Sequence, residues 1–126
     1  EGVQIGTRFA LTEESSASPV FKDYCLSLGE GDTKLLLKKL APTRLVKNAF
    51  REAVEKAEDS GASAEDLRTL LGRGRAKKGI FEGDLEEGEL EIGQVSAIIS
   101  RRQSVAEVMD ELVAAYQRAA KKDYLF

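Results

Sequence analysis

The stretch GVQIGTRFALTEES, residues 2–15, joins an apolar run to a segment rich in hydroxyl and acidic side chains. Apolar residues alternate in its first half, which predicts a short buried β-strand over residues 3–9. A strand needs a neighbour for its backbone hydrogen bonds, and we find no partner for this one in the rest of the sequence. We therefore expect the chain to begin in the middle of a larger fold.

The same stretch has the composition of a phosphate-binding turn at Gly6 and Thr7. Glycine lets the backbone approach a ligand closely, and the Thr7 hydroxyl and free N–H groups at a following helix start can bind phosphate oxygens. In eight-stranded α/β barrels, the loops after the seventh and eighth strands hold a ligand phosphate in this way. A Gly-Thr pair after a strand is also common in ordinary turns, so the pattern alone leaves both interpretations open.

Composition indicates a helix-rich globular chain of one domain at most, because 42% of the 126 residues are hydrophobic, 33% are charged and two are prolines. The net charge of -3 argues against nucleic acid or an anionic membrane as a main partner. There is no signal-like or long apolar segment, and the single cysteine, Cys25, cannot form an internal disulfide. We expect a cytoplasmic protein in which Cys25 is a packed apolar residue.

Turn and cap residues divide the remainder of the chain into short elements. The predicted elements are a helix over residues 20–28, two strands within residues 33–47, a helix over 49–59, a helix over 64–71, a glycine-rich loop over 72–93 with a helical turn at 76–81, and helices over 93–101 and 104–122. Asn48 and Ser63 are predicted N-caps, and Ser104 with Glu107 forms a capping box. The last helix has an apolar face that we expect to pack on a core.

Few residues of this chain are suited to catalysis. It contains no histidine, which removes the most common general base and metal ligand, so we expect no catalytic residue and no metal site here. The acidic run over residues 84–91 lacks the spacing of a calcium loop. The basic stretch over residues 73–78 can bind a phosphate-bearing ligand or an acidic partner, although a solvated surface cluster is the more common case.

Four separated blocks carry a family resemblance. GVQIGTRFALTEES, SPVFKDY, TRLVKNAF and GDLEEGELEIGQVS resemble, in this order, the C-terminal third of the nitronate monooxygenase and enoyl-acyl-carrier-protein reductase II family, with the reductase branch more similar. The resemblance implies part of an α/β fold, an FMN-binding (β/α)8 TIM barrel with a smaller inserted α+β lobe. Residues 1–19 would form barrel strand 8 and the phosphate-binding turn, residues 20–100 the small lobe over the flavin pocket, and residues 101–126 a closing helix against the barrel.

The resemblance also implies roles for individual residues. The residues that would contact the phosphate side of FMN are Gln4, Ile5, Gly6 and Thr7. Gln94 would line the substrate or nicotinamide side. Three glycines, at 83, 88 and 93, separate five acids over residues 83–94, so this loop can act as a mobile, solvated lid, and a purely structural loop is the alternative. Asn48 matches a recurring asparagine of the family, for which a helix cap is at least as good an explanation as a pocket role.

By the same resemblance, the parent protein would reduce the double bond of an enoyl-acyl carrier protein with NAD(P)H through FMN, during fatty-acid elongation. We also expect a homodimer. Nitronate oxidation with FMN and oxygen is the alternative within the family. A non-enzymatic helical interaction module, built on the basic stretch and the last helix, is the alternative outside it. The family's active-site histidine belongs to an upstream block that this sequence does not contain.

Overall fold

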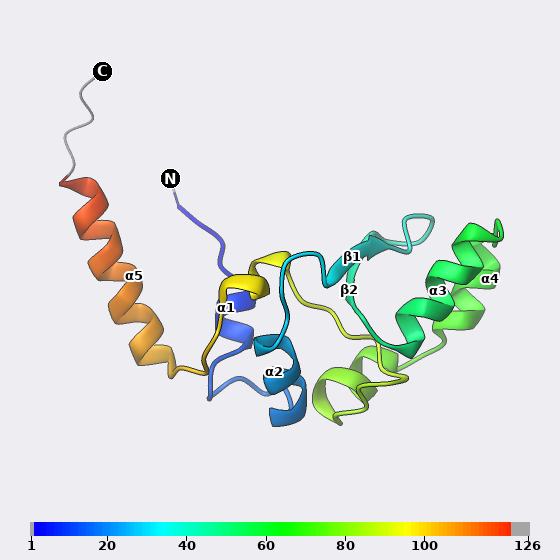
Figure 1. Ribbon diagram of the computed structural model, residues 1–126, viewed down its shortest axis with the longest axis horizontal. Coiled ribbons are helices and arrows are strands. Elements are labelled where there is room, and N and C mark those ends of the chain that lie inside the picture. Colours follow the sequence, from blue (N-terminus) through cyan, green and yellow to red (C-terminus); the bar gives the residue numbers. More distant parts are fainter. Residues whose placement is uncertain (1, 122–126) are drawn as a thin grey trace, which may run out of the picture.

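The computed structural model describes residues 2–121 and shows a mixed α/β chain with a two-stranded antiparallel sheet. The elements in chain order are α1 (Thr7–Ala10), α2 (Pro19–Leu26), β1 (Thr33–Leu36), β2 (Thr43–Val46), α3 (Ala49–Asp59), α4 (Ala64–Leu71), the π-helical turn η1 (Lys77–Phe81), the 3-10 helix η2 (Gln94–Ile98) and α5 (Val105–Ala120). The arrangement is elongated, with α5 extending from one side of α1 and α2 and the α3–α4 pair from the other (Figure 1).

Capping residues set the helix starts where the sequence predicted them. The Ser18 hydroxyl accepts a hydrogen bond from the backbone three residues on, and Pro19 fills the first position of α2. Ser63 and Ser104 each take part in a capping box, at the starts of α4 and α5. The predictions for α2, α3, α4 and α5 are therefore confirmed to within two residues, while Lys122 lies outside the described residues.

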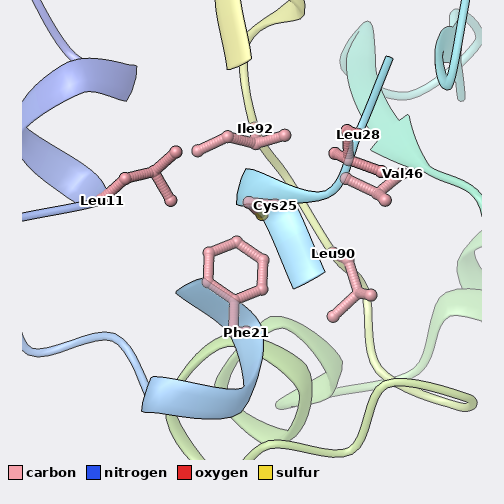
Figure 2. Packing of buried hydrophobic residues seen from close by; sticks show 7 residues of the cluster. All are labelled: Leu11, Phe21, Cys25, Leu28, Val46, Leu90 and Ile92. Carbon is pink, nitrogen blue, oxygen red and sulfur yellow. The ribbon is translucent and has the colours of Figure 1, made fainter. Parts of the chain in front are cut away.

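The predicted strand pair is confirmed as a hairpin of β1 and β2, and it separates two hydrophobic clusters. Adjacent residues of a strand point to opposite faces, so Leu45 packs into one cluster and Val46 into the other. The cluster around α2 consists of Leu11, Phe21, Cys25, Leu28, Val46, Leu90 and Ile92 (Figure 2). The cluster between the hairpin, α3 and α4 consists of Leu36, Leu37, Leu45, Phe50, Val54 and Leu67. The hairpin thereby joins the two parts of the chain.

Cys25 lies inside the first cluster, on α2 above Phe21 (Figure 2). Its side chain is fully buried, and burial raises the pKa of the thiol to about 12. A thiol with such a pKa stays protonated at neutral pH and is a poor nucleophile. The prediction that Cys25 is a packed apolar residue is confirmed.

The strand predicted over residues 3–9 is wrong for the described chain. Residues 2–6 have no regular secondary structure, and Thr7–Ala10 forms α1, whose first turn closes with a 3.0 Å hydrogen bond from the Ala10 N–H to the Gly6 carbonyl. Within residues 2–121 the strands β1 and β2 pair with each other, and neither pairs with this segment. Without a neighbour, an extended segment leaves its backbone groups unpaired, and a helical turn satisfies some of them locally.

The helix predicted over residues 93–101 is also shorter than expected. It is the 3-10 helix η2, closed by hydrogen bonds from Ser96 to Gly93 and from Ile99 to Ser96. The helical turn predicted at residues 76–81 is confirmed as η1, although its hydrogen bonds have π-helical spacing. Local signals thus predicted the place of both turns but not their hydrogen-bonding pattern.

The last helix begins as predicted, and within residues 2–121 most of its apolar face is left uncovered. Val108 is buried, whereas Met109, Val113 and Tyr116 are 46%, 49% and 74% exposed. This face forms one wall of an open groove of about 1010 Å³, and apolar side chains of residues 3–9 form the other. Within residues 2–121 no helix, α5 included, has the length and hydrophobicity to cross a membrane.

Candidate functional site

The four residues predicted to bind a phosphate lie together along one cavity. Gln4, Ile5, Gly6 and Thr7 line a cavity of about 400 Å³ with Arg8, and apolar residues from η2 and its C-terminal end form the remaining wall. A Cβ built on Gly6 would meet no other heavy atom within 4 Å. The backbone at Gly6 is therefore open to close approach by a ligand.

Thr7 connects this cavity to the end of the glycine-rich loop. Its Oγ1 accepts a hydrogen bond from the Gly93 N–H at 3.0 Å, across 86 positions of sequence. A Cβ on Gly93 would overlap Thr7 Oγ1, so the contact requires glycine at position 93. The Thr7 hydroxyl keeps its own proton for donation to another acceptor.

The loop over residues 83–94 is tied to the rest of the chain. Asn48 donates from Nδ2 to the carbonyl oxygens of Leu85, at 3.0 Å, and Gly88, at 2.7 Å. Gly88 packs against Gly79 of η1 so closely that a Cβ on either residue would overlap the other's backbone. These contacts and the burial of Glu89 and Leu90 contradict the prediction of a solvated loop and favour the structural alternative, in which Gly88 and Gly93 serve close packing. Movement of the loop as a lid stays a prediction.

Asn48 uses its side-chain amide for structure. Its Oδ1 accepts a 2.8 Å hydrogen bond from the Arg51 N–H at the start of α3, as a helix cap does. Both donors of its Nδ2 are engaged by the loop carbonyls. No amide donor remains for a ligand, which favours the helix-cap explanation of Asn48 over the pocket role.

Gln94 is the first residue of η2, and its side chain is exposed. Its neighbour Val95 lines the cavity, whereas Gln94 is not one of the lining residues. The structure places Gln94 next to the Thr7–Gly93 contact in sequence but does not bring its side chain to the phosphate-binding residues. Its role on the substrate or nicotinamide side stays a prediction.

The basic stretch over residues 73–78 is used for internal contacts. Arg75 donates to the last two carbonyls of α4 and to the Glu87 carbonyl, and its guanidinium lies 4.5 Å from the centre of the Phe50 ring. Two lysines of the stretch form ion pairs with acids of the adjacent turn and loop. These contacts favour a structural role over a ligand-binding one for the stretch.

Glu89 is a buried acid within the run that the sequence suggested to be solvated. Burial raises its pKa to about 7, helped by a hydrogen bond and charge repulsion from Glu91, while the charge of Arg75 acts in the opposite direction. Glu89 therefore binds a proton at a pH where an exposed glutamate is ionised. The sequence carried no sign of this, because the composition of the run does not show which of its acids the fold buries.

We expect the free energy of unfolding to fall as the pH rises toward neutrality. The folded pKa of Glu89, about 7, lies above the ordinary value of 4.5, so the folded state binds more protons between these values and loses that advantage at higher pH. After discounting for solvent screening, the difference between about pH 5.5 and about pH 8 is on the order of 1 kcal/mol. Urea unfolding of the wild type and Glu89→Gln measures it, and the amide should remove the difference. Equal pH dependence in both proteins would contradict this expectation.

Comparison with known proteins gives the family. The family model described as nitronate monooxygenase matches residues 1–115. The chain belongs to the nitronate monooxygenase family. Its structure is similar to that of FabK from Thermotoga maritima, with a TM-score of 0.79 and 28% sequence identity over 96% of this chain and 38% of that chain. A point mutant of the same FabK shares the fold, with a TM-score of 0.75 and 24% identity over 96% of this chain and 36% of that chain.

These comparisons confirm the family resemblance carried by the four sequence blocks. They also show that the described chain corresponds to little more than a third of the FabK structure, since it covers 38% of that chain. The mixed α/β arrangement of residues 2–121 therefore matches one part of a larger enzyme fold.

Proposed function

We propose that this chain supplies the phosphate-binding turn of an FMN-dependent oxidoreductase. The observation that supports this most directly is the shared cavity of Gln4, Ile5, Gly6 and Thr7, the four residues that the family resemblance implies for the FMN phosphate. Gly6 leaves open space beside its backbone, and the Thr7 hydroxyl retains a proton to donate. Arg8 lines the same cavity and adds a positively charged side chain that is 31% exposed. A phosphate group fits this set of donors.

Bound FMN would supply the hydride chemistry of such an enzyme, accepting a hydride from a reduced nicotinamide and passing it to the substrate. The residues of this chain would hold the phosphate end and so fix the orientation of the cofactor. Thr7 would donate from its hydroxyl while Gly93 holds its oxygen, which limits the rotation of that side chain. No residue of this chain is proposed as a general acid or base, and the sequence contains no histidine.

For the substrate, we propose an enoyl thioester carried by acyl carrier protein, reduced with NAD(P)H in the cytoplasm. Similarity to FabK, together with the sequence blocks of the reductase branch, supports this proposal. Nitronate oxidation with FMN and oxygen is the second candidate, and the description of the matching family model favours it. Both candidates use the same cofactor, so the phosphate-binding role of this chain is common to them.

The purified whole protein should show flavin absorbance and should oxidise NADH or NADPH when a crotonyl thioester is added. A nitroalkane with oxygen, in place of the thioester, distinguishes the two candidate reactions. Turnover of the nitroalkane alone would replace the reductase proposal with the oxidase. A protein that neither contains flavin nor binds added FMN would overturn the oxidoreductase proposal, leaving the interaction module as the alternative.

Gly6→Val tests the assignment of the turn. A β-branched side chain would fill the space beside the Gly6 backbone, so we expect affinity for FMN to fall about tenfold or more. The folded chain should be little affected, by about 0.5 kcal/mol or less, because no protein atom occupies that space. Isothermal titration with FMN and thermal unfolding without it measure the two effects.

Gly2→Val is the matched control for this experiment. Gly2 also has no heavy atom within 4 Å of a built Cβ, but it does not line the cavity. The control should bind FMN as the wild type does. Equal FMN affinity in Gly6→Val, Gly2→Val and the wild type would show that the phosphate does not lie at this turn.

A further inference from the structure

The β1–β2 hairpin concentrates positive charge in an acidic chain. Residues 33–47 contain five of the chain's 19 lysines and arginines and none of its 22 acids, although the whole chain has a net charge of -3. The five are Lys34, Lys38, Lys39, Arg44 and Lys47. A partner with an acidic surface would be attracted to the hairpin and repelled by the net negative charge of the remainder. The hairpin can therefore fix where such a partner docks.

The cations at the turn end of the hairpin are available to a partner. Lys38 and Lys39 are exposed in the turn that joins β1 to β2, at the edge of the molecule (Figure 1), and Arg44 is half-buried on β2. Lys34 pairs with Glu55 of α3, whereas these three cations form no ion pair within residues 2–121. Their charge is therefore not neutralised by a paired carboxylate in the described part of the chain.

An exposed leucine lies beside these cations. Leu35 on β1 and Arg44 on β2 are cross-strand partners, so their side chains share one face of the hairpin. This face is opposite to the one whose Leu36 and Leu45 pack against α3. Leu35 is 39% exposed, which adds an apolar contact to the charged surface. Lys38, Lys39, Arg44 and Leu35 form what we call the hairpin patch.

The hairpin patch borders the proposed flavin site. Arg44 and its neighbours Pro42 and Thr43 line an open cavity of about 440 Å³ together with Thr7 and Gly93. Thr7 and Gly93 are joined by the hydrogen bond beside the phosphate-binding turn. A protein resting on the hairpin patch would therefore lie next to the flavin site and within reach of this cavity.

We propose that the hairpin patch is the surface on which acyl carrier protein docks, through an acidic surface of its own. This inference rests on the proposed function, because a substrate attached to a carrier protein requires a protein partner beside the flavin. The patch would act on the association of the two proteins and would take no part in hydride transfer. Its effect should depend on ionic strength, since salt screens attraction between exposed charges.

The first measurement is the dissociation constant of the whole protein for fluorescently labelled acyl carrier protein, by fluorescence anisotropy. At an ionic strength of about 20 mM, Lys38→Glu should weaken binding about fivefold, and the double variant Lys38→Glu with Lys39→Glu about tenfold or more. Raising the ionic strength to about 200 mM should weaken binding of the wild type more than that of the double variant. Thermal unfolding checks that both variants are folded.

The second measurement compares turnover of two substrates with the same acyl group. For crotonyl-acyl carrier protein, kcat/KM of the variants should fall by about the same factors as the affinity. For the uncharged crotonyl thioester of N-acetylcysteamine, it should change by less than about twofold, since this substrate brings no protein surface to the hairpin patch. A defect of the flavin site itself would lower both rates together.

Arg73→Glu is the matched control. Arg73 is exposed and forms no ion pair among the residues that the structure describes, as is true of Lys38, and it does not line the cavity beside the hairpin. The substitution makes the same change in net charge as Lys38→Glu at a position outside the hairpin. It should leave carrier affinity within about twofold of the wild type.

The outcomes separate this inference from the proposed function. Weaker carrier binding in the hairpin variants, with wild-type binding in Arg73→Glu and unchanged turnover of the small thioester, supports the docking surface. Carrier affinity that is unchanged in the double variant, or lowered equally by Arg73→Glu, overturns the docking surface while the reductase proposal stands. A wild type that binds a short DNA duplex more tightly than the carrier also overturns it. A wild type that reduces neither substrate overturns the proposed reductase function and the docking surface with it.

Discussion

Gly88→Ala is expected to lower the free energy of unfolding by about 3 kcal/mol or more. A Cβ at this position would overlap the Cα of Gly79 and the carbonyl oxygen of Asp84, and would lie 2.8 Å from the Gly79 nitrogen. These are backbone atoms, so they cannot move aside as the end of a flexible side chain can. The variant can fold only if η1 and the loop over residues 83–94 separate, which would expose Leu90 of the first hydrophobic cluster.

Urea unfolding of Gly88→Ala beside Gly29→Ala measures this effect. Gly29 is a suitable control because neither glycine has a positive φ and a Cβ on Gly29 would meet Asp32 Oδ2 at an ordinary 3.7 Å. The control should stay within about 0.5 kcal/mol of the wild type. Similar midpoints for the two variants would mean that the close packing of Gly79 and Gly88 is not needed for stability.

Asn48→Ala is expected to cost about 2–3 kcal/mol, because three hydrogen bonds are lost together. The cap bond to the Arg51 N–H stabilises the start of α3, and the two Nδ2 bonds hold the carbonyls of Leu85 and Gly88. The variant should therefore loosen α3 and the loop at the same time. Hydrogen exchange of the Arg51 amide and of the loop amides, read beside the melting temperature, shows both effects.

Asn48→Ser separates the two roles of this side chain. A serine hydroxyl can still cap α3, but it is too short to reach the loop carbonyls. We expect protection of the Arg51 amide to remain and protection of the loop to fall, with a loss of stability smaller than that of Asn48→Ala. If Asn48→Ser were as stable as the wild type, the contacts between Asn48 and the loop would contribute nothing measurable.

The helix ends could be predicted from the sequence, and so could the hairpin, because both depend on residues that lie close together in the chain. A cap such as Ser63 or Ser104 bonds to a backbone group three residues away, and Pro42 breaks the run between β1 and β2. The family, too, was predictable, since four blocks that resemble it occur in the expected order, and the family model matches residues 1–115. The grouping of Gln4 to Thr7 in one cavity follows from their adjacency in the chain.

Other features of the site could not be predicted, because they join residues far apart in sequence. The Thr7–Gly93 hydrogen bond spans 86 positions, and the hydrogen bond between Arg8 and Gln103 spans 95. Nothing in the local pattern around Arg8 indicates that Gln103 and Glu111 would hold its guanidinium. Periodicity shows which residues share a face of an element, but it does not show which element they will face.

The sequence by itself determined the capped helices, the hairpin and the family of this protein, because short-range hydrogen bonds and ordered motifs are written in consecutive residues. Tertiary structure decided whether residues 3–9 form a strand, what the loop over residues 83–94 packs against, and whether Glu89 is solvated. Each of these depends on what lies beside the segment. A strand forms only next to another strand, and a glycine or a carboxyl acquires its role from the atoms packed against it.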